Sequence, residues 1–206
     1  MSNDATKKVL LMIADISGYT EFMVSSDLEI EHSQYVISEL IQSIIAQVEI
    51  PLEVAKLEGD AVFLYAIKDS EDYSWDDIAH SIGEKLILFF EAFHDKLDSL
   101  GNGGVCTCGA CTNTAVLNLK IVVHSGSALF YKIHQFNELS GSDVILVHRL
   151  LKNSATHTEY ILMTEDAYDD VAFPQHLQIE RSSEQYEHLG EYNTLIYYPH
   201  KQAATA

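Results

Sequence analysis

The order in which the hydrophobic periodicity changes along this chain constrains its fold more than any other feature. Residues 8–14 form an apolar run that is typical of a buried strand. Apolar positions spaced by one, three and four residues then predict a helix over residues 33–47. Two further strands, residues 52–57 and 61–67, flank a tight turn that contains Gly59, which is the pattern of a β-hairpin. The chain therefore begins as strand, helix and hairpin.

The rest of the chain continues this alternation. A helix begins at residues 75–77, and a second hairpin is expected over residues 116–134, with Ser125 and Gly126 as its turn. Shorter elements complete the pattern: helices at residues 144–151 and 165–171, and strands at residues 160–163, 177–181 and 194–198. This order predicts an α+β fold, a ferredoxin-like βαββαβ core with extra strands and helices. We expect the helices on one face of a mostly antiparallel sheet.

The length of 206 residues, 47% of them hydrophobic, suits one domain with a full core. No linker or repeat divides the sequence, so we expect a single domain over residues 1–206. The segment 101–114 is rich in Gly, Cys and Thr and lacks periodicity. We interpret it as a loop insertion.

The charge balance limits the classes of partner. The formal net charge is −19, which repels nucleic acid and anionic membranes. The apolar run at residues 9–14 is too short for a signal peptide or a membrane span. Three cysteines do not indicate a disulfide framework. We therefore expect a cytoplasmic protein that binds neither nucleic acid nor membrane. Any anionic nucleotide would need a metal ion or a focused basic pocket to offset the charge.

Two aspartates are the strongest candidates for chemistry. Asp15 follows the first strand, and Asp60 lies in the turn of the first hairpin, so both carboxylates can converge at one edge of the sheet. Hard oxygen ligands of this kind suit Mg²⁺ or Mn²⁺, which also bind substrate phosphates. Gly18 leaves backbone N–H groups open to phosphate where the next helix begins. Taken alone, each aspartate is more typical of a turn or a helix cap than of a catalytic site.

Three motifs resemble those of class III adenylate and guanylate cyclase catalytic domains. The stretch VLLMIADISGYT at residues 9–20 is similar to the first, an apolar strand followed by Asp, Ile, any residue, Gly, an aromatic residue and Thr. KLEGD at residues 56–60 is similar to the second motif, and SGSDVILVHR at residues 140–149 to the third, a Gly followed by a helix that ends in Arg. The resemblance covers residues 9–164 and is nearest to uncharacterised bacterial cyclase-homology proteins.

The resemblance implies a nucleotide cyclase-like sandwich and a role for each matching residue. Asp15 and Asp60 match the two metal-binding aspartates, and Ile16 would add its backbone carbonyl. Lys56 matches the lysine that reads the purine base, and Arg149 the arginine that stabilises the transition state. The implied substrate is a purine nucleoside triphosphate with Mg²⁺ or Mn²⁺. The implied assembly is a head-to-tail homodimer, because the site of such enzymes lies between two subunits.

Two positions depart from the family pattern. Ile145 stands where the family has an asparagine, four residues before the arginine, and isoleucine cannot hydrogen-bond a ribose or phosphate. Glu138 stands where the family has a base-reading aspartate. Two functions therefore stay open: a cyclase, which is a phosphorus–oxygen lyase, or a degenerate domain that binds a nucleotide or a partner protein as a signalling module.

The cysteines form a separate candidate site. Cys106, Cys108 and Cys111 are spaced so that three thiolates can take three corners of a tetrahedral Zn²⁺ site. A histidine such as His94 or His124 could supply the fourth ligand. The alternatives are a flexible loop of thiols, or a zinc-bearing structural protein in which this loop is the functional part.

Overall fold

The computed structural model describes residues 5–25, 30–49, 51–102 and 108–199 of the chain. Its strands are β1 (Ala5–Ser17), β2 (Glu53–Glu58), β3 (Ala61–Ile67), β4 (Asn118–Ile133), β5 (Phe136–Ser140), β6 (Tyr160–Thr164), β7 (Ile179–Tyr186) and β8 (Gly190–Tyr197). Its helices are α1 (Tyr19–Ser25), α2 (Ile30–Ile45), α3 (Trp75–Asn102), α4 (Gly109–Thr112), α5 (Ser142–Arg149) and α6 (Glu165–Asp170), with a 3₁₀ turn, η2, at Thr114–Val116.

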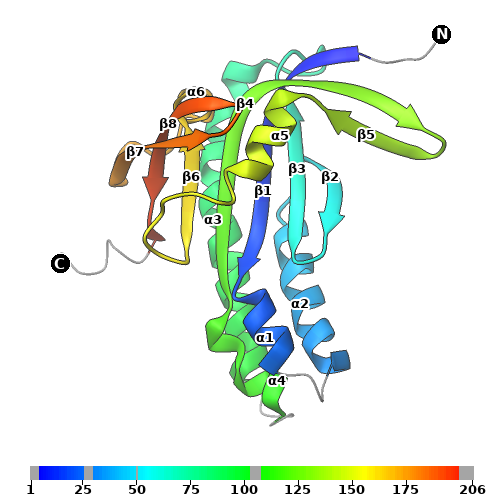
Figure 1. Ribbon diagram of the computed structural model, residues 1–206, viewed down its shortest axis with the longest axis vertical. Coiled ribbons are helices and arrows are strands. Elements are labelled where there is room, and N and C mark those ends of the chain that lie inside the picture. Colours follow the sequence, from blue (N-terminus) through cyan, green and yellow to red (C-terminus); the bar gives the residue numbers. More distant parts are fainter. Residues whose placement is uncertain (1–4, 26–29, 50, 103–107, 200–206) are drawn as a thin grey trace.

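The described strands form one eight-stranded sheet in the order β2-β3-β1-β4-β6-β8-β7, with β5 paired to β4 (Figure 1). The first four strands and the helices between them make the βαββαβ core, in which β1 lies between β3 and β4. Within the described sheet, β4 and β6 pair in parallel and the other neighbours are antiparallel. The predicted α+β, ferredoxin-like fold with extra strands and helices is confirmed.

Strand β1 is buried on both faces because its apolar run alternates between two cores. Leu10, Met12 and Ala14 belong to the core that α2 and α3 cover. Leu11 and Ile13 belong to a second core on the opposite face, where α5 packs. The expectation that all helices cover one face is therefore wrong for α5. A strand buried on both faces needs an apolar residue at every position, as this sequence provides.

The expected second hairpin, with its turn at Ser125 and Gly126, is also wrong. These residues lie in the middle of β4, a continuous strand of 16 residues, and pair with Leu10 and Val9 of β1. The glycine has a packing role: a Cβ at Gly126 would lie 2.3 Å from a carboxylate oxygen of Asp143. That oxygen accepts a hydrogen bond from the backbone N–H of Ser127 at 2.7 Å. Gly126 thus marks close packing of α5 on the sheet rather than a turn.

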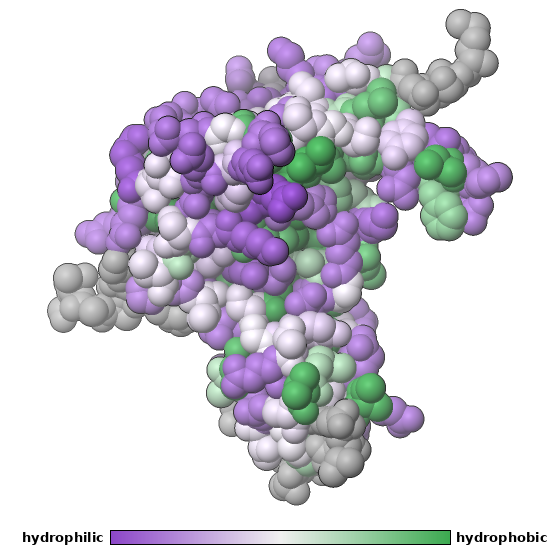
Figure 2. Space-filling view, in the orientation of Figure 1, coloured by the Kyte–Doolittle hydropathy of each residue, from purple (hydrophilic) through white to green (hydrophobic). Residues whose placement is uncertain are grey.

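The end of β4 and the whole of β5 form an arm, residues 129–140, that extends away from the body of the molecule (Figure 1). Three of its apolar side chains are exposed: Leu129 by 37%, Ile133 by 52% and Phe136 by 58%. Figure 2 shows apolar residues on this projecting part. A monomer gains nothing from exposing such side chains, so the arm is a candidate contact surface.

The segment 101–114 contains more regular structure than its composition predicts. Helix α3 continues to Asn102, and α4 forms at residues 109–112 before the 3₁₀ turn. Ala110 of α4 is fully buried in the core next to α2 and α3. Among the described helices, none is long and apolar enough to cross a membrane.

Raising the pH from about 6 to about 8 is expected to lower the free energy of unfolding through one partly buried ion pair. His94 of α3 lies 2.6 Å from Glu159, whose side chain is 5% exposed. The hydrogen bond with Glu159 raises the pKa of His94, against the opposite effect of burial. Between the ordinary histidine pKa and this raised value, the folded state holds a proton that the unfolded chain has released, so stability falls as pH rises.

The expected loss is about 0.5–1 kcal/mol, because His94 is one-third exposed and solvent weakens the pair. Urea unfolding at both pH values measures it. The variant His94→Gln should show a flatter dependence over this range, and an unchanged slope in that variant would contradict the assignment.

Candidate functional site

The fold brings Asp15 and Asp60 together at one end of the sheet. Asp15 is near the end of β1 and pairs in register with Ala61, the residue after Asp60. The backbone N–H of Ile16 donates a hydrogen bond to the carbonyl oxygen of Asp60 at 3.1 Å. The turn of the β2–β3 hairpin is therefore fixed against the end of β1. Ile16 itself is 1% exposed, and its side chain anchors this strand end in the core.

The electrostatics of the two aspartates indicate a site that needs positive charge. Burial raises the pKa of Asp15, and burial together with the charge of Asp15 raises the pKa of Asp60. A nearby cation stabilises the charged forms of two partly buried carboxylates. Their oxygens and a backbone carbonyl such as that of Ile16 are the hard donors that Mg²⁺ and Mn²⁺ prefer. The residues present therefore fit a divalent metal.

Lys120 is a member of this site that the sequence does not reveal. It pairs with Asp15 across β4 and β1, and its Nζ lies 3.3 Å from Asp15 Oδ1. Both side chains are mostly buried, at 21% and 16% exposed. The charge and hydrogen bond of Lys120 lower the pKa of Asp15 and oppose the effect of burial. Only the register of two strands 105 positions apart creates this contact.

The variant Lys120→Gln is expected to bind Mn²⁺ more tightly than the wild-type chain. The lysine forms an ion pair with Asp15 and also repels a second cation. Its removal therefore favours metal binding for two reasons. An ion pair of this exposure is worth about 0.5–1 kcal/mol, which corresponds to a roughly two- to fivefold lower dissociation constant. Isothermal titration with Mn²⁺ measures the change. Weaker binding in this variant would show that Lys120 supports the metal site rather than competing with it.

Gly18 lies in the turn between β1 and α1, and the backbone there requires glycine. Its φ of +84° lies in the left-handed region, and a Cβ would meet the carbonyl oxygen of Val116 at 2.1 Å. The carbonyl of Gly18 accepts a hydrogen bond from the N–H of Phe22 at 2.9 Å, which starts α1. This turn is therefore tightly fixed three residues after Asp15.

The structure also brings together Lys56 and Glu138, which come from different parts of the chain. Lys56 Nζ lies 3.5 Å from Glu138 Oε2, so β2 contacts β5 of the arm. The side chains are 55% and 30% exposed, which leaves them accessible to a ligand. A lysine and a carboxylate side by side offer donors and an acceptor to the polar edge of a base.

Arg149 is the last residue of α5 and is exposed. Its neighbour His148 connects α5 to the hairpin that bears Asp60. His148 Nε2 lies 3.0 Å from Glu58 Oε2, and its ring packs edge-on against Phe63 with centroids 5.0 Å apart. This histidine was not singled out from the sequence, because only the packing of α5 on the sheet shows its role. Ile145, one turn earlier, is 55% exposed.

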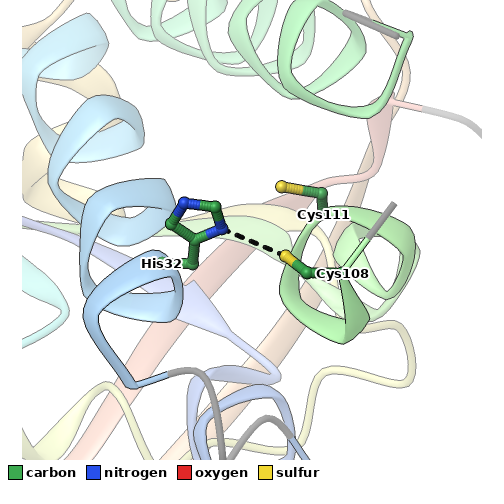
Figure 3. A group of neighbouring side chains, drawn as sticks. All are labelled: His32, Cys108 and Cys111. Carbon is green, nitrogen blue, oxygen red and sulfur yellow. Dashed lines mark hydrogen bonds between the residues drawn. The ribbon is translucent and has the colours of Figure 1, made fainter. Parts of the chain in front are cut away.

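The cysteine site differs from expectation in its histidine. Cys106 lies outside the described residues, while Cys108 and Cys111 lie beside His32 of α2 (Figure 3). Neither suggested histidine joins them: His94 contacts Glu159, and the Nδ1 of His124 lies 3.0 Å from the hydroxyl of Thr164. His32 is 76 residues from Cys108, and no spacing motif links them.

The fold is that of nucleotide cyclase catalytic domains. The chain resembles the guanylyl cyclase Cya2 with a TM-score of 0.73 at 11% identity, over 96% of this chain and 94% of that one. It resembles the adenylyl cyclase CyaB from P. aeruginosa with a TM-score of 0.66 at 13% identity, over 97% and 98% of the two chains. For the guanylate cyclase domain of RhGC from Catenaria anguillulae in complex with GTP, the TM-score is 0.64 at 14% identity, over 94% and 98%. These identities establish the fold alone.

By sequence, the chain belongs to a family described as protein of unknown function (DUF2652), whose model matches residues 37–160. It is also 31% identical over 128 residues to "Uncharacterized protein Rv2561/Rv2562" of Mycobacterium tuberculosis, a match that covers 62% of this chain. The match spans 57% of that relative's length.

Proposed function

We propose that this protein binds a purine nucleoside triphosphate with Mg²⁺ or Mn²⁺ and converts it to a cyclic nucleotide. The observation that carries the proposal is the pair Asp15 and Asp60, fixed at one end of a cyclase-like sheet by the hydrogen bond from Ile16 to Asp60. Burial raises the pKa of both carboxyl groups, so a bound cation would stabilise their charged forms. The fold positions the two aspartates, and their carboxylates would bind the metal.

Each step of the reaction has a candidate residue. Asp15 and Asp60 would hold the metal, which would supply a lower pKa for the ribose 3′ hydroxyl and positive charge against the phosphates. The 3′ oxygen forms a bond to the α-phosphorus, the bond from that phosphorus to the bridging oxygen breaks, and pyrophosphate leaves. The hydroxyl proton passes to solvent. The Gly18 turn contacts phosphate through backbone N–H groups, and Arg149 balances the negative charge.

Base recognition is assigned to Lys56 and Glu138. In the absence of ligand they pair with each other at 3.5 Å, and both remain accessible to solvent. A purine edge that enters between them exchanges this pair for hydrogen bonds to donor and acceptor atoms of the base. Because Glu138 lies on the arm, base binding and arm position are coupled in this proposal.

A second copy of the chain completes the site. The arm exposes Leu129, Ile133 and Phe136, and β2 exposes Leu57 by 54% close to Lys56. Apolar side chains on a projecting hairpin are suited to contact the other subunit of a homodimer. In this arrangement one subunit supplies the metal-binding aspartates and the other supplies Lys56, Glu138 and Arg149.

The second candidate is a catalytically degenerate domain that binds a nucleotide or a partner protein and signals by doing so. The observation that favours it is Ile145, which is exposed on α5 four residues before Arg149 and has no group that can hydrogen-bond substrate. Losing one such donor costs roughly 10²–10³ in rate in other enzymes.

The two candidates separate in one pair of measurements. The purified chain is incubated with ATP or GTP and Mn²⁺ and assayed for cyclic nucleotide, and the same nucleotides are titrated calorimetrically. Product establishes the cyclase and names the base. Binding without product supports the degenerate domain. If the chain gives no product and binds no nucleotide, both nucleotide proposals are contradicted.

A further inference from the structure

We propose that His32, Cys108 and Cys111 bind a Zn²⁺ ion that fastens α4 to the start of α2. This site is separate from the aspartate pair and serves the structure of the chain rather than the nucleotide chemistry. His32 lies in the first turn of α2, Cys108 immediately precedes α4, and Cys111 lies within it.

The geometry of the three side chains fits a shared ion. Figure 3 shows the imidazole ring of His32 facing the two sulfur atoms, which point toward it from α4. The Nδ1 of His32 lies 3.1 Å from the Sγ of Cys108, and the ligand atoms of all three residues lie within 4.8 Å of one another. Tetrahedral zinc, with Zn–S of about 2.3 Å and Zn–N of about 2.0–2.1 Å, places such donors about 3.5–3.8 Å apart. Small side-chain rotations bring these donors to that spacing.

The donor set selects the ion. Two thiolates and an imidazole are soft and borderline ligands, which favour Zn²⁺ and disfavour the Mg²⁺ or Mn²⁺ that carboxylates hold. Cys108 and Cys111 follow the Cys-x-x-Cys spacing of zinc sites, with the second cysteine in a short helical turn. Three protein ligands leave one tetrahedral position for water or a further donor.

A bound ion would supply stability that α4 lacks by itself. The helix has four residues, of which Ala110 is the buried one, so little apolar surface holds it in place. A helix this short does not persist without tertiary contacts. Metal ligands from two separate segments close the long loop between them and contribute folding free energy directly. The site would fix α4 against α2 at the end of the molecule opposite the arm (Figure 1).

This position connects the zinc site to the turn that precedes α1. Asn113, the residue after α4, donates a hydrogen bond from Nδ2 to the hydroxyl of Ser25 at the end of α1, at 2.9 Å. Three residues further, the carbonyl of Val116 contacts Gly18 so closely that no side chain fits. The zinc site thus stabilises the segment against which the Gly18 turn packs.

Metal analysis of the purified chain tests the proposal without any nucleotide. The chain is purified without an affinity tag or added chelator, and zinc is measured by mass spectrometry. We expect about one zinc per chain, and Co²⁺ in its place should give the visible absorption of tetrahedral cobalt with thiolate ligands. His32→Ala and Cys111→Ser should each weaken zinc binding by more than the roughly 10- to 100-fold that loss of an outer-sphere partner costs. The control is His80→Ala, which removes an exposed histidine from α3 and should leave binding unchanged.

Thermal unfolding guards against variants that do not fold. A strong chelator should lower the midpoint of the wild-type chain and of His80→Ala, and should leave folded His32→Ala unaffected. Metal-free wild-type protein that takes up no zinc, or full zinc binding in His32→Ala, would overturn the proposal. None of these outcomes depends on whether the aspartate site binds nucleotide.

Discussion

Replacing Asp15 and Asp60 together with asparagine is expected to abolish metal-dependent formation of cyclic nucleotide, with a loss of at least about 10³-fold. Removing one electrostatic group from such a site typically costs 10²–10³, and here both metal carboxylates are lost. The substitutions keep the shape of the side chains, so the packing at the end of β1 is preserved. The measurement is the initial rate of product formation with Mn²⁺ and saturating ATP or GTP.

Stability gives this experiment a second readout. Burial raises the pKa of both carboxyl groups, which means that folding disfavours their charged forms. The double asparagine variant should therefore be at least as stable as the wild-type chain without metal, and only the wild type should gain in melting temperature when Mn²⁺ is added. A control variant, Asp69→Asn with Asp72→Asn, removes two exposed charges from the loop before α3. Equal metal responses in both variants would refute the assignment of the metal site.

The variant Ile145→Asn is expected to raise the rate of cyclisation by about 10- to 100-fold. It introduces an amide at the position where the resemblance to cyclases places an asparagine, one helical turn before Arg149. A hydrogen-bond donor that acts in the transition state contributes a factor of roughly 10²–10³ to the rate in a site that evolved with it. We expect a smaller gain from a donor introduced by substitution. Ile145 is 55% exposed, so the exchange costs little folding free energy.

The matched control is Ile145→Ala, which removes the same exposed apolar side chain without adding a donor. A gain in the asparagine variant alone identifies the amide as the missing group. Equal rates in the two variants would indicate that activity is limited elsewhere, and a gain in alanine as well would indicate that the isoleucine obstructs the site.

The spacing of apolar residues and glycines over short stretches of sequence predicts the elements that form through local interactions. The apolar run of β1, the helical spacing of α2 and the Gly59 turn each encode their element within a few residues, and the predicted strand–helix–hairpin order is confirmed. The same logic failed at Gly126, because a glycine in a strand is required by the approach of Asp143 from α5, which no local pattern reports.

The residues of the candidate site likewise divide into those that the sequence predicts and those that only the tertiary structure reveals. Asp15 and Asp60 could be proposed from their places beside a strand and in a turn, but Lys120 enters only through the register of β1 and β4. His32 meets Cys108 only because α2 and α4 pack together. Residues that act across the sheet or between helices are brought together by tertiary structure, and spacing along the chain does not record them.

The two proposed metal sites differ in how metal binding would be coupled to folding. At the aspartate site, the ammonium group of Lys120 balances the charge of Asp15, with Nζ 3.3 Å from Oδ1. Under the proposed function, a divalent metal would therefore displace Lys120 from Asp15, and the chain would fold before it binds that metal. At the proposed zinc site, the free energy of binding the ion would itself contribute to folding. The metal at the aspartate pair would then exchange with solution, whereas the zinc ion would stay bound as part of the folded structure.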